Sequence, residues 1–251
     1  MTPTAPASEL FASKLFEASP AKVRAGRPFE PLKEKELEVP LRILAARLPG
    51  SRDGVYVTPE FVGSNGIADL VAVTRAEPAL QLRLIGGLPF LDNLSIATIA
   101  AAIPIGRPIS TEALSRRLHM SPRQVAVYCR ELESMGIICR RGIGYRRDFS
   151  IRPVGRMYAF EAKVSDWSRA MGQAVRYSSW ADAAAVVLLR TPAHLDKVAG
   201  HARAMRIGLA IGSSWIVRPR ITGPSAPAHA GARLLASERF VQSVATKLSG
   251  S

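Results

Sequence analysis

Apolar strand-like runs and amphipathic helix-like segments alternate along much of this chain, and this alternation limits its possible folds more than any other feature. Runs rich in Val, Leu and Ala, typical of buried strands, occur at 54–63, 67–75, 156–164 and 183–190. Such an order predicts an α/β fold, in which helices flank a central mixed sheet. The stretch 91–153 differs, because three helical patterns follow one another there. We therefore expect a second module that interrupts the α/β domain.

The chain divides where this texture changes. We expect a flexible N-terminal segment at 1–28, the α/β core at 29–90 and again at 154–221, the inserted module at 91–153, and a linker with a C-terminal helix at 222–251. The first segment is rich in Ala, Pro, Ser and Lys, and a Pro- and Gly-containing stretch precedes the last helix. A chain of 251 residues is long enough for this arrangement.

Basic residues clearly outnumber acidic ones. The sequence has 34 Lys and Arg against 20 Asp and Glu, a net charge of +14. Half of this surplus lies between 107 and 156, where eleven arginines face four acidic residues. A surplus of this size indicates a polyanionic partner, most often nucleic acid. Arg suits phosphate and guanine in particular, because its planar guanidinium donates two parallel hydrogen bonds.

The inserted module combines three helical patterns with a hairpin pattern. Its third helix begins with Ser121 and Pro122, a pair typical of a helix N-terminus, and RRGIGYRR then forms a glycine-containing turn. Over 94–151 this layout resembles the winged helix-turn-helix family. The resemblance implies a recognition helix in the major groove and a basic wing on the DNA backbone; a winged helix used for protein contacts is the alternative. The DNA-binding residues that we expect are Ser121, Arg123, Gln124, Arg130, Arg140, Arg141, Arg146 and Arg147.

Charged residues stand in two otherwise apolar strand patterns. Glu161 and Lys163 are two residues apart, so both side chains point to one face of their strand, and Asp69 lies near the start of another. A buried charge is costly unless a metal, a partner or a substrate compensates it. An Asp and a Glu in one cleft form an oxygen-ligand site for Mg²⁺, and a Lys beside it can orient the attacking water. A surface ion pair is the structural alternative.

Three motifs in this order resemble the PD-(D/E)xK nuclease superfamily, in its RecB-like branch. They are GIAD at 66–69, EAK at 161–163 and QAVRY at 173–177. The resemblance implies a restriction-endonuclease-like core. It also implies that Asp69 and Glu161 bind Mg²⁺ or Mn²⁺, that Lys163 positions the water, and that Gln173 and Tyr177 support the site from one helical face.

The chain departs from the family pattern in one respect. About ninety residues separate Asp69 from Glu161, where the family has a short hairpin. We interpret the inserted module as an insertion at the hairpin tip, beside the catalytic cleft, and the site then requires its two strands to pair. An acidic residue of the first helix often completes the family's site. The candidates are Glu34, Glu36, Glu38 and Glu60, of which Glu38 is preferred.

Together these features predict a metal-dependent endonuclease that hydrolyses phosphodiester bonds of double-stranded DNA and is targeted by the inserted winged helix. A homodimer, or a partner subunit of a defence or mobile-element system, fits this activity, as does a role in repair. The alternative is a DNA-binding transcriptional regulator whose nuclease-like core is an inactive scaffold or dimerisation domain. An RNA nuclease or toxin is a third hypothesis.

Cysteine usage and the N-terminus suggest a cytoplasmic, nucleoid-associated protein. Cys129 and Cys139 lack metal-ligand spacing, and we expect both to be reduced and partly buried. The first ten residues lack the basic and then apolar pattern of a signal peptide. The four histidines show no ligand spacing either, so metal binding is expected from carboxylates.

Overall fold

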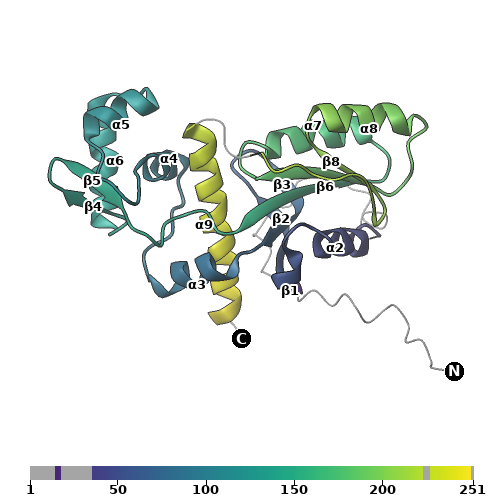
Figure 1. The fold of residues 1–251 in the computed structure, drawn as a ribbon, viewed down its shortest axis with the longest axis horizontal. Coiled ribbons are helices and arrows are strands. Elements are labelled where there is room, and N and C mark those ends of the chain that lie inside the picture. Colours follow the sequence, from purple (N-terminus) through teal and green to yellow (C-terminus); the bar gives the residue numbers. More distant parts are fainter. Residues whose placement is uncertain (1–14, 18–35, 223–226, 250–251) are drawn as a thin grey trace.

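A seven-stranded mixed sheet forms the centre of the α/β domain in the computed structural model, which describes residues 15–17, 36–222 and 227–249 (Figure 1). The strand order is β1-β2-β3-β6-β7-β8-β9. Strands β6, β7 and β8 run parallel, whereas β3 is antiparallel to both of its neighbours. The strands are β1 (Leu15–Glu17), β2 (Val55–Val62), β3 (Ile67–Thr74), β6 (Arg156–Lys163), β7 (Ala183–Leu188), β8 (Gly208–Ile211) and β9 (Ser214–Val217). The predicted α/β class is thus confirmed.

Helices cover both faces of this sheet (Figure 1). Helix α2 (Glu38–Ala46) packs through Leu41 and Leu44 on one face, against Phe160 of β6. Helices α7 (Trp167–Tyr177) and α8 (Leu195–Ala204) pack on the opposite face. Because successive side chains of a strand point to opposite faces, the odd-numbered residues of β6, including Glu161, lie on the α7 face.

Between β3 and β6, residues 91–151 form a helical unit with its own apolar core, whereas Leu80 of the preceding helix belongs to the core of the sheet. Helix α3 (Glu77–Ile85) leads into α4 (Leu94–Ala102), α5 (Thr111–Leu118) and α6 (Pro122–Ser134), and a hairpin of β4 (Ile138–Arg141) and β5 (Gly144–Arg147) follows. We call α4, α5, α6, β4 and β5 the inserted module. Asn93, Ser110 and Ser121 cap the starts of its helices with their side-chain oxygens.

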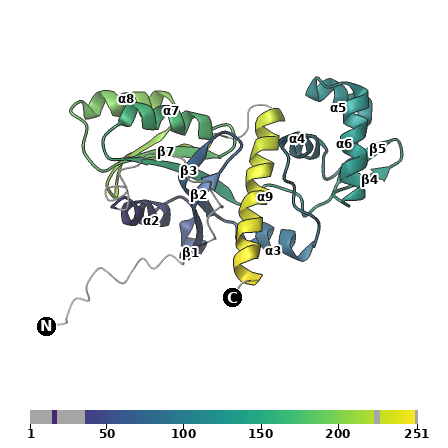
Figure 2. The ribbon, with the colours of Figure 1, turned by 180° about the vertical axis from the view of Figure 1, so that it is seen from behind.

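The long helix α9 (Pro227–Ser249) lies between the sheet and the inserted module (Figures 1 and 2). Phe240 and Val241 belong to the apolar core of the sheet, whereas Leu234 and Leu235 belong to that of the module. Gly231 sits so close to α4 that an added Cβ would lie 2.2 Å from Thr98 Oγ1. The helix predicted at the C-terminus therefore joins both cores, which the sequence did not indicate.

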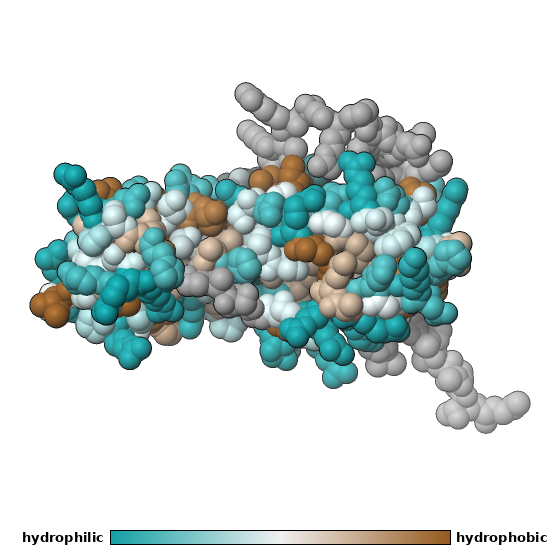
Figure 3. All heavy atoms as spheres, turned by 90° about the horizontal axis from the view of Figure 1, so that it is seen from above, coloured by the Kyte–Doolittle hydropathy of each residue, from teal (hydrophilic) through white to brown (hydrophobic). Residues whose placement is uncertain are grey.

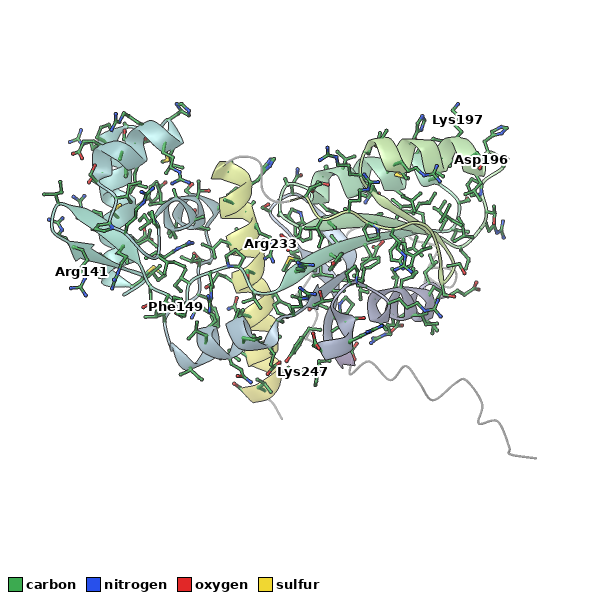
Figure 4. The ribbon with its side chains drawn as sticks, in the orientation of Figure 1. Arg141, Phe149, Asp196, Lys197, Arg233 and Lys247 are labelled. Atoms are coloured by element: carbon green, nitrogen blue, oxygen red, sulfur yellow. The ribbon has the colours of Figure 1, made fainter. Side chains whose placement is uncertain are left out.

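Two buried ion pairs tie α9 to the chain crossings between core and module. Glu238 accepts from Arg83 Nε at 2.9 Å and Nη2 at 2.8 Å, and Arg83 also donates to the carbonyls of Leu88 and Pro89. On the returning crossing, Arg233 (labelled in Figure 4) pairs with Asp182 at 2.9 Å and donates to the carbonyl of Val154. Buried charges need partners of this kind, so these contacts fix how the two parts sit together, although Nη1 of Arg233 has no hydrogen-bond partner among the described residues.

The N-terminal prediction needs one correction. Leu15–Glu17 falls within the segment expected to be flexible, yet it forms β1, which pairs in parallel with β2. Three residues are too few for a recognisable alternation, so no sequence pattern announced this strand. The rest of 1–28 lies outside the described residues.

The surface seen from above is mainly hydrophilic, with hydrophobic residues mostly in separate spots (Figure 3). Among the helices that the structure describes, none is both long and apolar enough to cross a bilayer. Both cysteines are free thiols, but they differ in exposure: Cys129 is buried and Cys139 is exposed, rather than both being partly buried.

Candidate active site

Asp69 and Glu161 come from paired neighbouring strands. The β3–β6 ladder runs from Thr74 opposite Arg156 to Leu70 opposite Phe160, and Asp69 and Glu161 are the next residues on each strand. At this position the Asp69 side chain takes the place of a backbone acceptor in the ladder: its Oδ2 accepts a hydrogen bond from the amide of Ala162 at 2.7 Å. The pairing that the site requires is therefore present despite the long insertion.

Glu161 is a buried carboxylate with two close partners. Its side chain is 1% exposed. One oxygen, Oε2, lies 2.5 Å from the hydroxyl of Tyr177, and the other, Oε1, lies 3.0 Å from Nζ of Lys163. The Lys163 contact is an ion pair without hydrogen-bond alignment, since Oε1 has no hydrogen-bond partner among the described residues. A buried carboxylate oxygen with this capacity left is suited to a further cation.

Helix α7 presents Gln173 and Tyr177 to these carboxylates. The two residues are four apart, so they share one helical face, and both are buried. The Tyr177 hydroxyl also lies 2.5 Å from the carbonyl oxygen of Ile67, so its single proton is shared between two acceptors. Burial, followed by the charges of Glu161 and Asp69, raises the pKa of Tyr177 well above its usual value. The phenol therefore stays protonated and donates.

Gln173 brings a second buried acceptor. Its Oε1 has no hydrogen-bond partner within the described part of the chain. Such an unsatisfied oxygen is costly in a purely structural role, because a buried polar atom normally finds a partner. It is accounted for if a ligand or an ordered water binds to this oxygen.

Glycines in the β2–β3 turn make room for the helix. Gly66 has φ of +101°, and an added Cβ would lie 3.2 Å from the ring of Tyr177. Gly63 leaves no space for a side chain either, because a Cβ would lie 2.3 Å from Trp180. The glycine of the GIAD motif is thus explained by left-handed backbone and by close packing against the Tyr of the third motif.

Glu38, the preferred third acidic residue, is not brought to this site. It begins α2, which covers the other face of the sheet, and its carboxylate pairs with Arg42 at 3.0 Å. Of the other candidates, Glu36 is exposed and Glu34 lies outside the described residues. Glu60 is exposed and has a left-handed backbone, with φ of +47°. It stands opposite Asp69 at a position where β2 and β3 are not paired.

The residues present fit Mg²⁺ or Mn²⁺ in type. Mg²⁺ is commonly bound through one or two carboxylates, with waters and substrate phosphates as its other ligands. Asp69 and Glu161 provide two carboxylates, and Oε1 of Glu161 is the unsatisfied acceptor described above. No group of three or more His, Cys, Asp or Glu side chains able to hold a metal occurs in the described part, so a closed protein cage is not formed there.

The inserted module does not lie beside this site, contrary to the expectation. The chain leaves the sheet toward the module after Thr74 and returns at Arg156, whereas Asp69 and Glu161 lie toward the other ends of β3 and β6. At a rise of about 3.3 Å per residue, Glu161 is roughly 17 Å along β6 from Arg156. The insertion is at the hairpin tip as expected, but the carboxylates are not.

The expected DNA-binding residues of the module differ in their availability. Ser121 and Gln124 form a capping box, in which each side chain bonds the other's backbone at the start of α6. Arg147 is partly buried, and burial lowers its pKa to about 10. Arg146 is also partly buried. The arginines exposed to solvent are Arg123, Arg130, Arg140 and Arg141, the last at the edge of the hairpin in Figure 4.

A basic cluster outside these motifs was not predicted. Arg203, Arg206, Arg218 and Arg220 line one cavity at the end of α8 and β9. The pattern Arg-Pro-Arg at 218–220 is the only local signal, and the other two arginines join it through the fold.

Comparison of the chain with protein family models, curated proteins and solved structures finds no match. The functional assignment therefore depends on the chemistry and geometry of the residues themselves.

Proposed function

We propose that this protein is a Mg²⁺-dependent DNA endonuclease of the PD-(D/E)xK type, with the inserted module acting as a DNA-binding winged helix. The observation that carries the proposal is the environment of Glu161: a 1% exposed carboxylate on the strand next to Asp69, with Lys163 at 3.0 Å and Tyr177 at 2.5 Å. A structural role does not require this combination of buried charge and unsatisfied acceptor.

The sheet supports the proposal independently of the motifs. Motif-bearing β3 and β6 are adjacent, and the helix with Gln173 and Tyr177 follows β6 directly and leads to the parallel strand β7. This is the order of elements that the resemblance implies for a restriction-endonuclease-like core, a mixed sheet flanked by helices. The three motifs thereby lie on two paired strands and on the helix that packs against them.

Each residue then has a defined role. Asp69 and Glu161 would hold the metal ion, which would polarise the scissile phosphate as a Lewis acid. Lys163, whose side chain is 17% exposed, would orient the attacking water and offset charge that develops on the phosphate. Tyr177 donates to Glu161 and fixes the orientation of its carboxylate, while Gln173 lies one turn before Tyr177 on the same buried side of α7.

Phosphodiester hydrolysis needs little covalent chemistry from these residues. Water adds through its oxygen to phosphorus, the ester bond breaks, and the departing oxygen takes up a proton. Catalysis therefore depends on positioning and electrostatics, for which a rigid pair of strands is well suited.

The inserted module would supply DNA affinity. Arg123 lies in the first turn of α6, and Arg140 and Arg141 on β4 leave their guanidinium groups exposed. Because Ser121 and Gln124 cap the helix, Arg123 is the stronger candidate for a base contact. The roughly 17 Å between module attachment and carboxylates predicts cleavage at a distance from the DNA bound by the module.

A DNA-binding regulator with an inactive core is the second candidate. One observation favours it: the described residues contain only two carboxylates at the site, since Glu38 lies on the other face of the sheet. In this alternative the inserted module binds DNA and the buried charges serve the stability of the scaffold.

Cleavage and binding measured on the same samples separate these candidates. Supercoiled plasmid and labelled duplexes are incubated with Mg²⁺ or Mn²⁺, and DNA binding is followed by gel shift in EDTA. Lys163→Ala is compared with Lys197→Ala, a matched loss of one exposed lysine on α8. We expect Lys163→Ala to slow cleavage about 100-fold or more while binding persists. Binding without cleavage by every protein, on all DNA forms, favours the regulator; cleavage unaffected by Lys163→Ala refutes the assigned site.

A further inference from the structure

A cavity of about 330 Å³ on the α/β domain is lined by four arginines from two separate segments. Arg203 and Arg206 come from the end of α8, and Arg218 and Arg220 follow β9. The remaining lining residues are apolar (Ile207, Ile216, Val217 and Pro219), so none of the described residues that line the cavity is acidic. All four arginine side chains are exposed.

The end of α8 holds two of these arginines in a defined geometry. The amide of Arg206 donates to the carbonyl of Arg203, and the amide of Ile207 donates to that of Ala202, as in a Schellman motif. Arg206 occupies the left-handed position of this motif, with φ of +59°, where glycine is favoured. The backbone of Arg206 is thereby held in place by the hydrogen bonds that end α8.

The segment after β9 fixes the other two. Pro219 packs against the start of β8, since a Cβ on Gly208 would lie 3.0 Å from the Cδ of Pro219. In an extended chain, the side chains of consecutive residues point to opposite sides, so residues two apart share a side. Arg218 and Arg220 are therefore directed to the same, exposed side, on a backbone held by the sheet.

The charges of this cluster are not balanced within the protein. None of the four guanidinium groups forms a hydrogen bond or an ion pair in the part of the chain that the structure describes. The carbonyls at the end of α8 favour nearby cations, but this explains only Arg203 and Arg206. Four unpaired like charges around one cavity repel each other, so the arrangement is suited to an anion.

We propose that this arginine cluster binds consecutive phosphates of a nucleic-acid backbone. The guanidinium fork matches phosphate oxygens, and an open, exposed cluster drawn from a helix end and a strand end suits a chain of phosphates better than one enclosed small molecule. That the chain is DNA rests on the proposed function. The location of the cluster fits DNA binding together with the inserted module. The cluster lies beside Gly208, where β8 begins, and the parallel strands β6, β7 and β8 all begin toward the end of the sheet at which the module is attached.

The test uses the full chain without any catalytic step. Fluorescence anisotropy measures binding of a labelled DNA duplex in EDTA over a series of KCl concentrations. Arg218→Ala/Arg220→Ala is compared with wild type and with Arg52→Ala/Lys197→Ala, which removes the same charge from exposed positions elsewhere (Lys197 is labelled in Figure 4). Because the substituted side chains are exposed and unpaired, thermal unfolding of the free protein should be unchanged.

We expect the arginine variant to bind at least 10-fold more weakly at low salt and to lose about 2 from the slope of log K against log salt, close to 0.9 per phosphate contact. The control double variant should stay near wild type. Equal affinity and slope in both double variants, or no binding of duplex by wild type at low salt, refutes the cluster as a phosphate site. Selective loss of binding in the arginine variant supports it even where Mg²⁺ produces no cleavage, so failure of the nuclease proposal is recognised separately.

Discussion

Substituting Glu238 by Gln should destabilise the protein more than most single changes. The change keeps the shape of the side chain but removes its charge. Arg83 and Glu238 are each 1% exposed, and the pair is bidentate at 2.9 and 2.8 Å. Glu238 also accepts from the amide of Leu91 at 3.2 Å. Removing one partner of such a pair leaves an uncompensated buried charge, which costs about 3–5 kcal/mol.

The size of this effect is measured by urea unfolding, followed by tryptophan fluorescence and by circular dichroism. A loss of about 3–5 kcal/mol corresponds to a decrease in melting temperature of roughly 6–20 °C for a chain of this size. The matched control is Glu38→Gln, which breaks the ion pair with Arg42, where the Glu38 side chain is 63% exposed. Its expected cost is below about 1 kcal/mol.

One result would refute the reasoning: a cost for Glu238→Gln that is no larger than that of Glu38→Gln. It would mean that α9 does not hold the core and the inserted module together through this pair.

Three further predictions concern packing, pH and thiol reactivity. Gly231→Ala should lower the free energy of unfolding by at least about 1–3 kcal/mol, because its Cβ would meet Thr98 at 2.2 Å; urea unfolding measures this, and no loss would contradict the α4–α9 contact. Because the pKa of Tyr177 is raised in the folded protein, the neutral phenol stabilises the fold; this stabilisation is complete below pH 10, the ordinary pKa of Tyr, and is lost as pH rises above it. Tyr177→Phe should therefore flatten the alkaline loss of stability by about 1.4 kcal/mol per pH unit, and an unchanged slope would be evidence against the buried phenol. A thiol reagent should modify Cys139 in the native protein but Cys129 only after unfolding, since Cys129 is buried and burial raises its pKa to about 11; two rapid native reactions would contradict this.

Features with a local sequence signal could be predicted, and those that depend on distant pairing could not. The alternation of β6 placed Glu161 and Lys163 on one face, and spacing by four placed Gln173 and Tyr177 together. In contrast, Arg83 and Glu238 are 155 residues apart, and nothing near either residue indicates the pair. The packing of α9 on both cores was missed for the same reason.

Two predictions about position were wrong: the face of the sheet that the first helix covers, and the place of the inserted module relative to the carboxylates. Glu38 is close in sequence to the first strands, but a helix can cover either face of a sheet, and α2 covers the face opposite α7. The position of the inserted module could have been inferred by counting residues. Asp69 stands near the start of β3, whereas the insertion follows its end, so the length of the strand separates them.

The central claim is that Asp69 and Glu161 form a divalent-cation site, and Mn²⁺ binding tests it most directly. Electron paramagnetic resonance titration of the full chain would compare wild type with Asp69→Asn and Glu161→Gln, and with Asp196→Asn as an exposed control on α8. Circular dichroism confirms that each variant is folded. We expect a Mn²⁺ site in wild type and in Asp196→Asn, and binding weakened at least about 10-fold in both site variants. Equal Mn²⁺ binding by all four folded proteins, or none by wild type, would contradict it.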